Sequence, residues 1–253
     1  MTNFKQKTAV ITGAAGGIGK YLSEFLSIRK CNLVLIDLPQ KSLELETLQQ
    51  RLQKQYCTAI KVLPVDVQNV KEMKEALKIL VVESIQIDFL INNVGINILK
   101  PALDITEDEW DKVLDTNLKG NFFMTRFIGE QMFQTGGGSI VFIASQHGVV
   151  ANLDRVAYCS SKAALIHLSK ALALEWAQFN IRVNCVSPTF VETDNNKELL
   201  SSVKYKRELL KQIPLGTYAK PEDIAYSIEY LLSEKSKCVT GHNLLIDGGW
   251  TIK

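Results

Sequence analysis

A glycine-rich turn between a short apolar run and a helical pattern constrains the fold of this chain more than any other feature. The run Thr8–Thr12 predicts a buried strand, and the turn that follows holds four glycines within residues 13–19. Glycines let the backbone turn tightly and let a phosphate approach the free N–H groups at the start of the next helix. The sequence therefore predicts a dinucleotide-binding βα unit, and a tight turn without a ligand is the less favoured alternative.

The rest of the chain repeats this alternation of strand and helix. Apolar runs such as Asn32–Asp37 predict buried strands, and the amphipathic stretches between them predict helices. Six alternations and one closing strand predict an α/β protein, a single-domain Rossmann fold over residues 1–253 with a doubly wound seven-stranded parallel sheet and helices on both faces. Ligands of such sheets bind at the carboxyl ends of the strands. The residues expected at those ends are Gly13, Asp37, Asp66, Asn92, Ser145 and Pro188.

Charge and composition argue against several classes of function. The 253 residues carry a net charge of +2 without a block of like charges, so neither a nucleic acid nor a membrane is expected as a partner. The apolar runs are too short to cross a bilayer, and the first residues lead into a strand without the apolar segment of a signal peptide. Five scattered cysteines without a Cys-x-x-Cys pair indicate reduced thiols, a cytoplasmic location and no metal site.

Two acidic residues at the ends of strands bear on the cofactor. Along the sequence, Asp37 follows Gly13 at about the separation that is typical of the carboxylate that binds the adenosine ribose of NAD. It would repel the 2′-phosphate of NADP, and the glycine turn has no Lys or Arg to attract one, so NAD(H) is preferred over NADP(H). The alternative is that Asp37 only begins a loop. Asp66 could contact the adenine amino group or, equally, cap the helix that begins near Asn69.

A tyrosine and a lysine four residues apart carry the expected chemistry. Tyr158 and Lys162 lie in the helical pattern 158–178, one turn apart on one face. A nearby ammonium favours the phenolate, and a pKa about two to three units below 10 would let a tyrosine act as a base near neutral pH. Ser145 could hold a substrate oxygen close to that phenol. Taken alone, the motif favours a surface tyrosine beside a solvated lysine. The other residues expected at the strand ends reverse this preference and favour a catalytic pair.

Two further helical stretches have unusual features. The stretch 107–134 contains Asn117 and Gly120 in its interior, where both are poor helix formers. Asn117 could hold a water and loosen the helical hydrogen bonds, or it could be a satisfied core amide. The polar stretch 194–212 predicts a mobile helical flap over the site, within about residues 189–213, and its charges suit a solvated face.

Several motifs occur together in one order and at one spacing. They are Thr12-Gly13-x-x-x-Gly17-x-Gly19, Asn92-Asn93-Val94-Gly95, Asn117, Ser145, Tyr158-x-x-x-Lys162, and Asn184-x-x-x-Pro188 with Thr193. On these residues the whole chain resembles the short-chain dehydrogenase/reductase family, in its short type of about 250 residues. The closing run from Asp247 to Ile252 and the run from Ser145 to Gly148 are similar to gluconate- and polyol-type members.

Two positions depart from the family's usual pattern. Val94 stands where an alanine is usual, and Thr189 stands where a glycine follows Pro188. We expect Val94 to tighten the packing near the cofactor and Thr189 to alter the shape of the substrate pocket. Neither change removes a reacting group.

The resemblance implies a role for each matching residue. Tyr158 is the general acid and base, Lys162 lowers its pKa and binds the nicotinamide ribose, and Ser145 orients the substrate oxygen. Asn117 positions a water that relays protons to Lys162, while the oxidised nicotinamide adds a second positive charge. The implied cofactor-binding residues are Gly13, Ala15, Gly17, Ile18, Gly19, Asp37, Asp66, Val67, Asn93, Gly95, Tyr158, Lys162, Pro188, Val191 and Thr193.

The activity that the resemblance implies is hydride transfer between NAD(H) and a carbon bearing oxygen, in a secondary alcohol or its ketone. The residues expected to line the substrate pocket are Gln146, His147, Asn152, Thr189 and Phe190. Their polar groups suit a sugar, sugar acid or polyol, and His147 suits a wall residue better than a second base. The alternatives are a 3-oxoacyl thioester reductase and, in another class, a non-catalytic dinucleotide-sensing protein. By analogy with the family, a homotetramer is expected.

Overall fold

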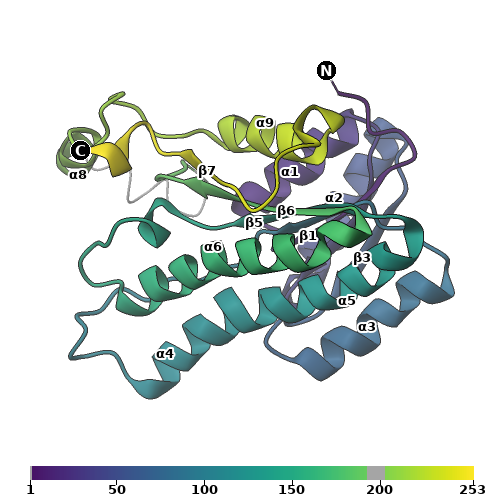
Figure 1. The fold of residues 1–253 in the computed structure, drawn as a ribbon, viewed down its shortest axis with the longest axis horizontal. Coiled ribbons are helices and arrows are strands. Elements are labelled where there is room, and N and C mark those ends of the chain that lie inside the picture. The colour runs from purple at the N-terminus through teal and green to yellow at the C-terminus, as the bar shows by residue number, and fades with distance from the viewer. Residues whose placement is uncertain (1, 193–202) are drawn as a thin grey trace.

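The computed structural model describes residues 2–192 and 203–253, and within 203–206 it describes the backbone only. Seven parallel strands form one twisted sheet in the order β3-β2-β1-β4-β5-β6-β7 (Figure 1). The order reverses between β1 and β4, and the carboxyl edge beside such a reversal is where ligands bind in open α/β sheets. The strands are β1 Thr8–Thr12, β2 Asn32–Asp37, β3 Ile60–Pro64, β4 Phe89–Asn92, β5 Gly138–Ile143, β6 Ile181–Pro188 and β7 Asn243–Ile246.

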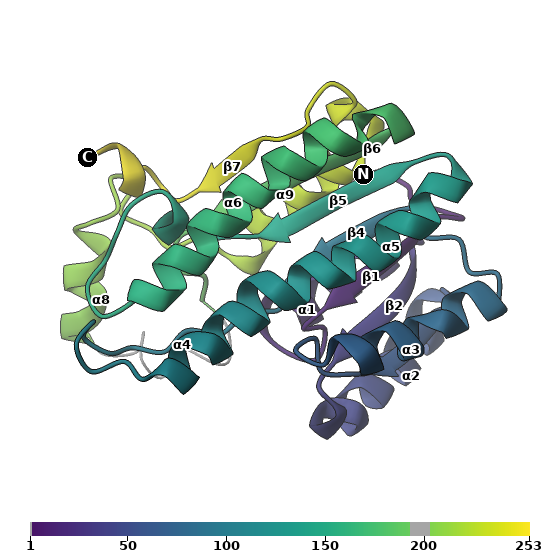
Figure 2. The ribbon, with the colours of Figure 1, turned by 60° about the horizontal axis from the view of Figure 1, so that its bottom comes forward.

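Helices cover both faces of the sheet, as the alternation of patterns predicts (Figure 2). On one face lie α1 Gly17–Ile28, α2 Ser42–Tyr56 and α9 Pro221–Leu232. On the other lie α3 Val70–Val82, α4 Glu107–Leu114, α5 Asn121–Thr135 and α6 Val156–Trp176. Helix α8, Val203–Leu210, lies beside the C-terminus at the carboxyl edge. The predicted doubly wound parallel sheet is confirmed.

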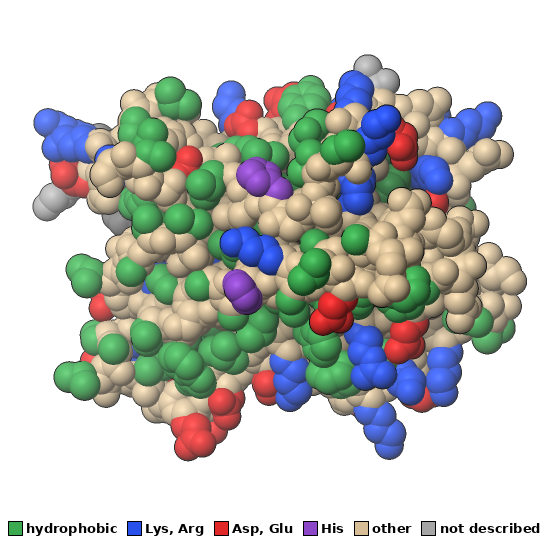
Figure 3. Space-filling model, in the orientation of Figure 1, with side chains coloured by type: hydrophobic (Ala, Val, Ile, Leu, Met, Phe, Trp, Pro, Cys, Tyr) green, Lys and Arg blue, Asp and Glu red, His purple; other side chains and the backbone are tan. Residues whose placement is uncertain are grey.

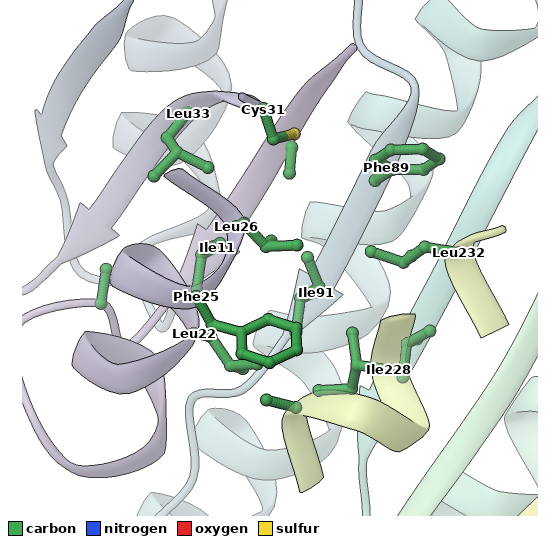
Figure 4. Packing of buried hydrophobic residues seen from close by; sticks show 14 of the residues in the cluster. Ile11, Leu22, Phe25, Leu26, Cys31, Leu33, Phe89, Ile91, Ile228 and Leu232 are labelled. Carbon is green, nitrogen blue, oxygen red and sulfur yellow. The ribbon is translucent and has the colours of Figure 1, made fainter. Parts of the chain in front are cut away.

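Two apolar cores follow from the two covered faces. All five residues of β1 are buried, which explains why its sequence is a continuous apolar run and not an alternating one. On the α1 side, Leu22 and Phe25 of α1 face Ile228 of α9 across the sheet residue Ile91 (Figure 4). The second core contains Phe142 of β5 among side chains from α3, α5 and α6.

The predicted single helix over residues 107–134 is interrupted by a π-helical turn, Asp115–Gly120, between α4 and α5. A Cβ atom on Gly120 would lie 2.8 Å from the carbonyl oxygen of Val67, so only glycine allows this close approach. Asn121 Nδ2 donates to the carbonyl oxygen of Asn117 at 2.8 Å inside the turn. The helical bonding is loosened around Asn117, and the Asn117 amide is also fully hydrogen-bonded, as the core-amide alternative expects.

The predicted helix over residues 158–178 corresponds to α6, Val156–Trp176, which is shifted by two residues at each end. Of the predicted flap, the structure describes α8 and the turn after it, while residues 193–202 lie outside the described residues. No described helix is both long and apolar enough to span a membrane.

A buried ion pair joins α1 to α9, and the sequence patterns did not reveal it. Arg29 Nη2 lies 2.9 Å from Glu229 Oε2, and the guanidinium stacks 3.3 Å from the centroid of the Phe25 ring. The backbone N–H of Thr2 donates to Glu229 Oε1 at 2.8 Å. Burial opposes ionisation of Glu229, but the hydrogen bonds from Arg29 and Thr2 outweigh it and lower the pKa of that carboxyl.

We expect Glu229→Ala to lower the free energy of unfolding by about 3–5 kcal/mol, because it leaves the buried Arg29 guanidinium without its counter-ion. Denaturant unfolding at neutral pH measures this loss. The matched control is Glu130→Ala, which removes the exposed partner of Arg126 on α5. That surface pair contributes about 0.5 kcal/mol or less. Equal losses in the two variants would contradict a stabilising role for the buried pair.

Candidate active site

The carboxyl ends of β1 to β6 surround one elongated cavity of about 820 Å³. The loops after β2 and β3 form one end, the glycine turn after β1 lies between, and the loops after β5 and β6 form the other end. Most of the residues predicted from the sequence therefore share one site. Those that line it are Gly13, Ala15, Gly17, Ile18, Asp37, Asp66, Val67, Asn93, Gly95, Ser145, Gln146, His147, Tyr158, Lys162, Pro188, Thr189, Phe190 and Val191.

The glycine turn is shaped to receive an anion. Gly13 and Gly17 have φ values of +64° and +51°, in the left-handed region that favours glycine. A Cβ atom on Gly19 would lie 2.0 Å from the carbonyl oxygen of Gly13, so Gly19 packs the helix under the turn and does not line the cavity. The N-cap of α1 is Gly16, which offers no side chain to its N–H groups, and the first turn has no acidic residue. These N–H groups remain available to a phosphate.

Asn93 and Thr12 hold the glycine turn in place. Asn93 Nδ2 donates to the carbonyl oxygens of Thr12 and Gly13, at 3.0 and 3.1 Å. In return, Thr12 Oγ1 accepts from the backbone N–H groups of Asn93 and Val94. The loop after β4 is thus fastened to the loop after β1 across the point where the strand order reverses.

Two carboxylates lie at the end of the cavity near the glycine turn. Asp37 Oδ2 accepts from the backbone N–H of Ala15 at 2.8 Å, and its Oδ1 accepts from Leu38 at 2.9 Å, which fixes the carboxylate beside the turn. Asp66 Oδ1 accepts from the N–H of Gln68. The N-cap of α3 is Asn69, so the alternative in which Asp66 caps this helix is wrong.

Ser145 and Tyr158 lie at the opposite end, where the loop after β5 packs against α6. Gly148 makes this packing possible, because a Cβ atom there would lie 2.7 Å from the side chain of Ile166 on α6. Ser145 Oγ accepts from the N–H of His147 at 3.1 Å, so its own hydrogen is directed to other acceptors, such as the phenol oxygen of Tyr158. The structure therefore brings a hydroxyl donor to the same end of the cavity as the phenol.

Lys162 is buried in the floor of the cavity. Its Nζ donates to the carbonyl oxygen of Ile143 at 2.7 Å and lies 5.7 Å from the centroid of the Tyr158 ring. Burial lowers the pKa of Lys162 to about 8. At pH 7 roughly nine of ten molecules therefore still carry the positive charge. A Cβ atom on Gly95 would lie 3.2 Å from this Nζ, so the backbone of the loop after β4 passes close to the ammonium.

The protein alone raises the pKa of Tyr158. Burial of the phenol is the largest cause, and it outweighs the hydrogen bond with Ser145 and the positive charge of Arg155, both of which lower the pKa. The lowering of the Tyr158 pKa by Lys162 and by an oxidised nicotinamide, implied by the family resemblance, stays a prediction.

Asn117 reaches the catalytic end from beneath and does not line the cavity. Its Oδ1 accepts from the N–H of Ile96 at 2.8 Å, and its Nδ2 donates to the carbonyl oxygen of Ile96 and to Ser161 Oγ. Ser161 in turn donates to the carbonyl oxygen of Tyr158. Asn117 thus connects the loop after β4 to the first turn of α6. Ser161 is part of this connection and was not predicted from the sequence.

Aromatic rings and unpartnered polar groups form the wall beside Tyr158. The centroid of the His147 ring lies 6.4 Å from that of Tyr158, 6.1 Å from that of Phe190 and 6.3 Å from that of Trp250. Burial, followed by the charge of Arg155, lowers the pKa of His147 to about 4, so its imidazole is neutral at pH 7 and suits a wall.

Three buried side chains on this wall have polar atoms without a hydrogen-bond partner among the described residues. They are both amide atoms of Gln146, Nδ1 of His147 and Oγ1 of Thr189. Buried polar atoms are nearly always satisfied in folded proteins, so a cluster of exceptions beside a cavity points to a ligand.

Several residues lie elsewhere or were not predicted. Asn152 does not line the cavity, and its side chain accepts from the N–H of Leu153. Thr193 lies outside the described residues.

Arg155 lines the cavity three residues before Tyr158, and this spacing was the signal that could have revealed it. Within residues 2–192 and 207–253, no three His, Cys, Asp or Glu side chains are placed to hold a metal ion.

Comparison with known proteins extends over the whole chain. A family model described as "Enoyl-(Acyl carrier protein) reductase" matches residues 13–251. An NAD-dependent glycerol dehydrogenase of Listeria innocua is 38% identical, over 99% of this chain and 96% of its own length. A D-threitol dehydrogenase of Mycolicibacterium smegmatis is 35% identical, over 98% and 94%. A 3-oxoacyl-[acyl-carrier-protein] reductase of Rickettsia typhi is 34% identical, over 98% of each chain.

Solved structures also match nearly the whole chain. An NAD⁺-bound xylitol dehydrogenase superposes with a TM-score of 0.91 at 27% identity, over 97% of this chain and 99% of its own. A putative NAD(P)-dependent gluconate 5-dehydrogenase of Beutenbergia cavernae gives 0.92 at 28% identity, over 99% of each chain. With its seven-stranded sheet, its glycine turn and these relatives, the chain belongs to the short-chain dehydrogenase/reductase family.

Proposed function

We propose that this protein is an NAD(H)-dependent oxidoreductase that interconverts a secondary alcohol and its ketone in a polyol, sugar or sugar acid. The observation that carries the proposal is the placement of Ser145, Tyr158 and Lys162 at one end of a cavity that extends past the glycine turn to Asp37 and Asp66. That arrangement suits a long dinucleotide whose reactive ring reaches the phenol.

The residues of this chain fit a nicotinamide dinucleotide. The uncapped N-terminus of α1 and the turn around Gly13 would hold the pyrophosphate. Asp37 would accept hydrogen bonds from the adenosine ribose, and Lys162 would donate to the other ribose. Among the described residues the only hydrogen bond of Lys162 Nζ is the one to Ile143, which leaves two of its three hydrogens for such acceptors.

The chain itself manages the proton. When bound, the cofactor would supply the acceptor or donor of the hydride. Ser145 Oγ donates to the substrate oxygen and holds it beside Tyr158, whose phenol takes the hydroxyl proton in oxidation and returns it in reduction. Lys162 stabilises the phenolate by its positive charge. Asn117 keeps the first turn of α6 in register with the loop after β4 through Ser161.

The unpartnered polar wall favours a substrate with several hydroxyl groups. A buried amide or hydroxyl without a partner costs about 1–3 kcal/mol, and a polyhydroxylated substrate could remove that cost at Gln146 and Thr189. Relatives named for glycerol and threitol are consistent with this class. The alternative substrate is a 3-oxoacyl thioester, in keeping with the carrier-protein reductase among the relatives.

Kinetics with a substrate panel test the proposal. We expect turnover of NAD⁺ with polyols such as glycerol, threitol and xylitol at a kcat/KM at least tenfold above that of simple secondary alcohols and of 3-oxoacyl thioester reduction. We expect Tyr158→Phe to lower kcat/KM by roughly 10²–10⁴-fold, because it removes the group that transfers the proton. The variant should bind NADH as the original protein does, measured by nicotinamide fluorescence.

Three outcomes would decide against this reading. Fastest turnover of a thioester would establish the carrier-protein alternative. Cofactor binding without turnover of any panel member would favour a dinucleotide-sensing protein. Full activity of Tyr158→Phe would remove the phenol from the mechanism.

We further propose that NAD(H) is preferred over NADP(H). The carboxylate of Asp37 is fixed beside the glycine turn by Ala15 and Leu38, where it would repel a 2′-phosphate. We expect the ratio of kcat/KM for NAD⁺ to that for NADP⁺ to be about 100 and to fall roughly tenfold in Asp37→Asn. Asp66→Asn is the control, since it should weaken both cofactors alike. A similar change of preference in both variants would contradict the assignment to Asp37.

The remaining proposals concern the assembly, the flap and the location of the protein. An exposed apolar groove runs along α4, α5 and α6, and Figure 3 shows hydrophobic side chains gathered there. We propose that this groove is covered in a homotetramer. We also propose that residues around 189–213 act as a mobile flap over the substrate. The third proposal is that the protein works in the cytoplasm. All five cysteines are free thiols, as the reducing cytoplasm favours. The groove is lined by Leu114, Asp115, Leu118, Lys119, Phe122, Phe123 and Leu168.

Light scattering tests the assembly. We expect a mass near four times 28.3 kDa for the original chain. Phe122→Glu should yield smaller species, because a charge within a buried apolar interface is not compensated. A mass of a single chain at micromolar concentration for the original protein would contradict the tetramer.

A further inference from the structure

Arg155 lies at the catalytic end of the cavity without a counter-ion. It is the N-cap residue of α6, its side chain lines the cavity, and its Nε is buried without a hydrogen-bond partner. No described acidic side chain forms an ion pair with it. A partly buried guanidinium usually has such a partner, so its presence here calls for a function.

The position of Arg155 relative to Tyr158 suggests what that function is. Arg155, at the N-cap of α6, precedes Tyr158 by three residues, and Lys162 follows it by four. All three residues line the same cavity. Tyr158 therefore shares the catalytic end of the cavity with two positive charges supplied by the chain itself.

No described carboxylate offsets these charges. The acidic residues that line the cavity are Asp37 and Asp66, and both belong to the end near the glycine turn. The other titratable groups beside the phenol are His147, which is neutral at pH 7, and the thiol of Cys159. In the folded protein the charge of Arg155 lowers the pKa of Tyr158 against the larger opposing effect of burial.

We propose that Arg155 is a positioning residue that stabilises the phenolate of Tyr158 together with Lys162. The inference rests on the proposed acid–base role of Tyr158. Arginine suits this task because it keeps its charge at every working pH, whereas Lys162 begins to lose its charge near pH 8. Arg155 would thus continue to oppose the rise in the Tyr158 pKa in the pH range in which Lys162 loses its charge.

Titration of the phenol tests the proposal without any substrate. The near-ultraviolet absorbance of tyrosinate is recorded against pH, and the signal of Tyr158 is isolated from the seven tyrosines by subtracting Tyr158→Phe in the same background. We expect Arg155→Gln to raise the pKa of Tyr158 by about half a unit to one unit. Arg155→Lys should restore most of the difference, and Arg155→Met serves as a second neutral variant if the glutamine variant folds poorly.

The pH dependence of the two reaction directions gives a second readout. For alcohol oxidation, kcat/KM in Arg155→Gln should fall roughly three- to tenfold below the pKa of Tyr158 and approach the original value above it. For ketone reduction, the same rise in pKa should extend activity to higher pH. A shift of one titrating group moves the two directions in opposite senses, which a general structural defect would not do.

Arg126→Gln is the matched control, because it removes one arginine charge from the exposed surface of α5, where Arg126 pairs with Glu130. It should leave the phenol titration and both pH profiles unchanged. An unchanged Tyr158 pKa in folded Arg155→Gln and Arg155→Met would overturn the proposal. So would a rise in KM for the substrate that is equal at all pH values, since that would make Arg155 a substrate contact. If no substrate is turned over, the proposed function fails, while the titration still decides the role of Arg155.

Discussion

The burial of one ammonium group is the constraint on which the site depends. Lys162 has no carboxylate partner among the described residues, and the carbonyl oxygen of Ile143 is the group that compensates its burial. Such a position is tenable only if α6 lies tightly against the end of β5, which Gly148 permits, and if the loop after β4 passes close by, which Gly95 permits. The same close packing brings Tyr158 to the cavity, so the fold and the chemistry rest on one arrangement.

The sequence was sufficient to predict the sheet and the general position of the site. Glycines that the chain cannot replace, such as Gly13, mark the turn, and buried strands such as β1 appear as continuous apolar runs. The carboxyl ends of parallel strands share one edge, so the sequence alone predicts that residues far apart in the chain lie together. These features are local patterns combined with one topological rule.

The rest depends on contacts between elements that no local pattern records. The pair of Arg29 with Glu229 joins residues 200 positions apart, and each alone resembles an ordinary surface charge. The role of Ser161 comes from the place of its hydroxyl between Asn117 and the backbone of α6, which the sequence does not show. The isolation of Arg155 could not be read from the sequence, because many acidic residues were available to pair with it.

The π-helical turn between α4 and α5 has a consequence for how this chain can vary in length. A π turn accommodates one residue more than an α-helix does over the same rise, and each residue rotates a helix by about 100°. Deleting one residue from Asp115–Gly120 would therefore restore regular α-helical winding and leave α4 and α5 facing as they do now. The loss would fall on the turn itself, where Asn117 bonds to Ile96 and Gly120 approaches the backbone of Val67. A one-residue deletion here should thus preserve the helix pair and disturb the support beneath the cavity.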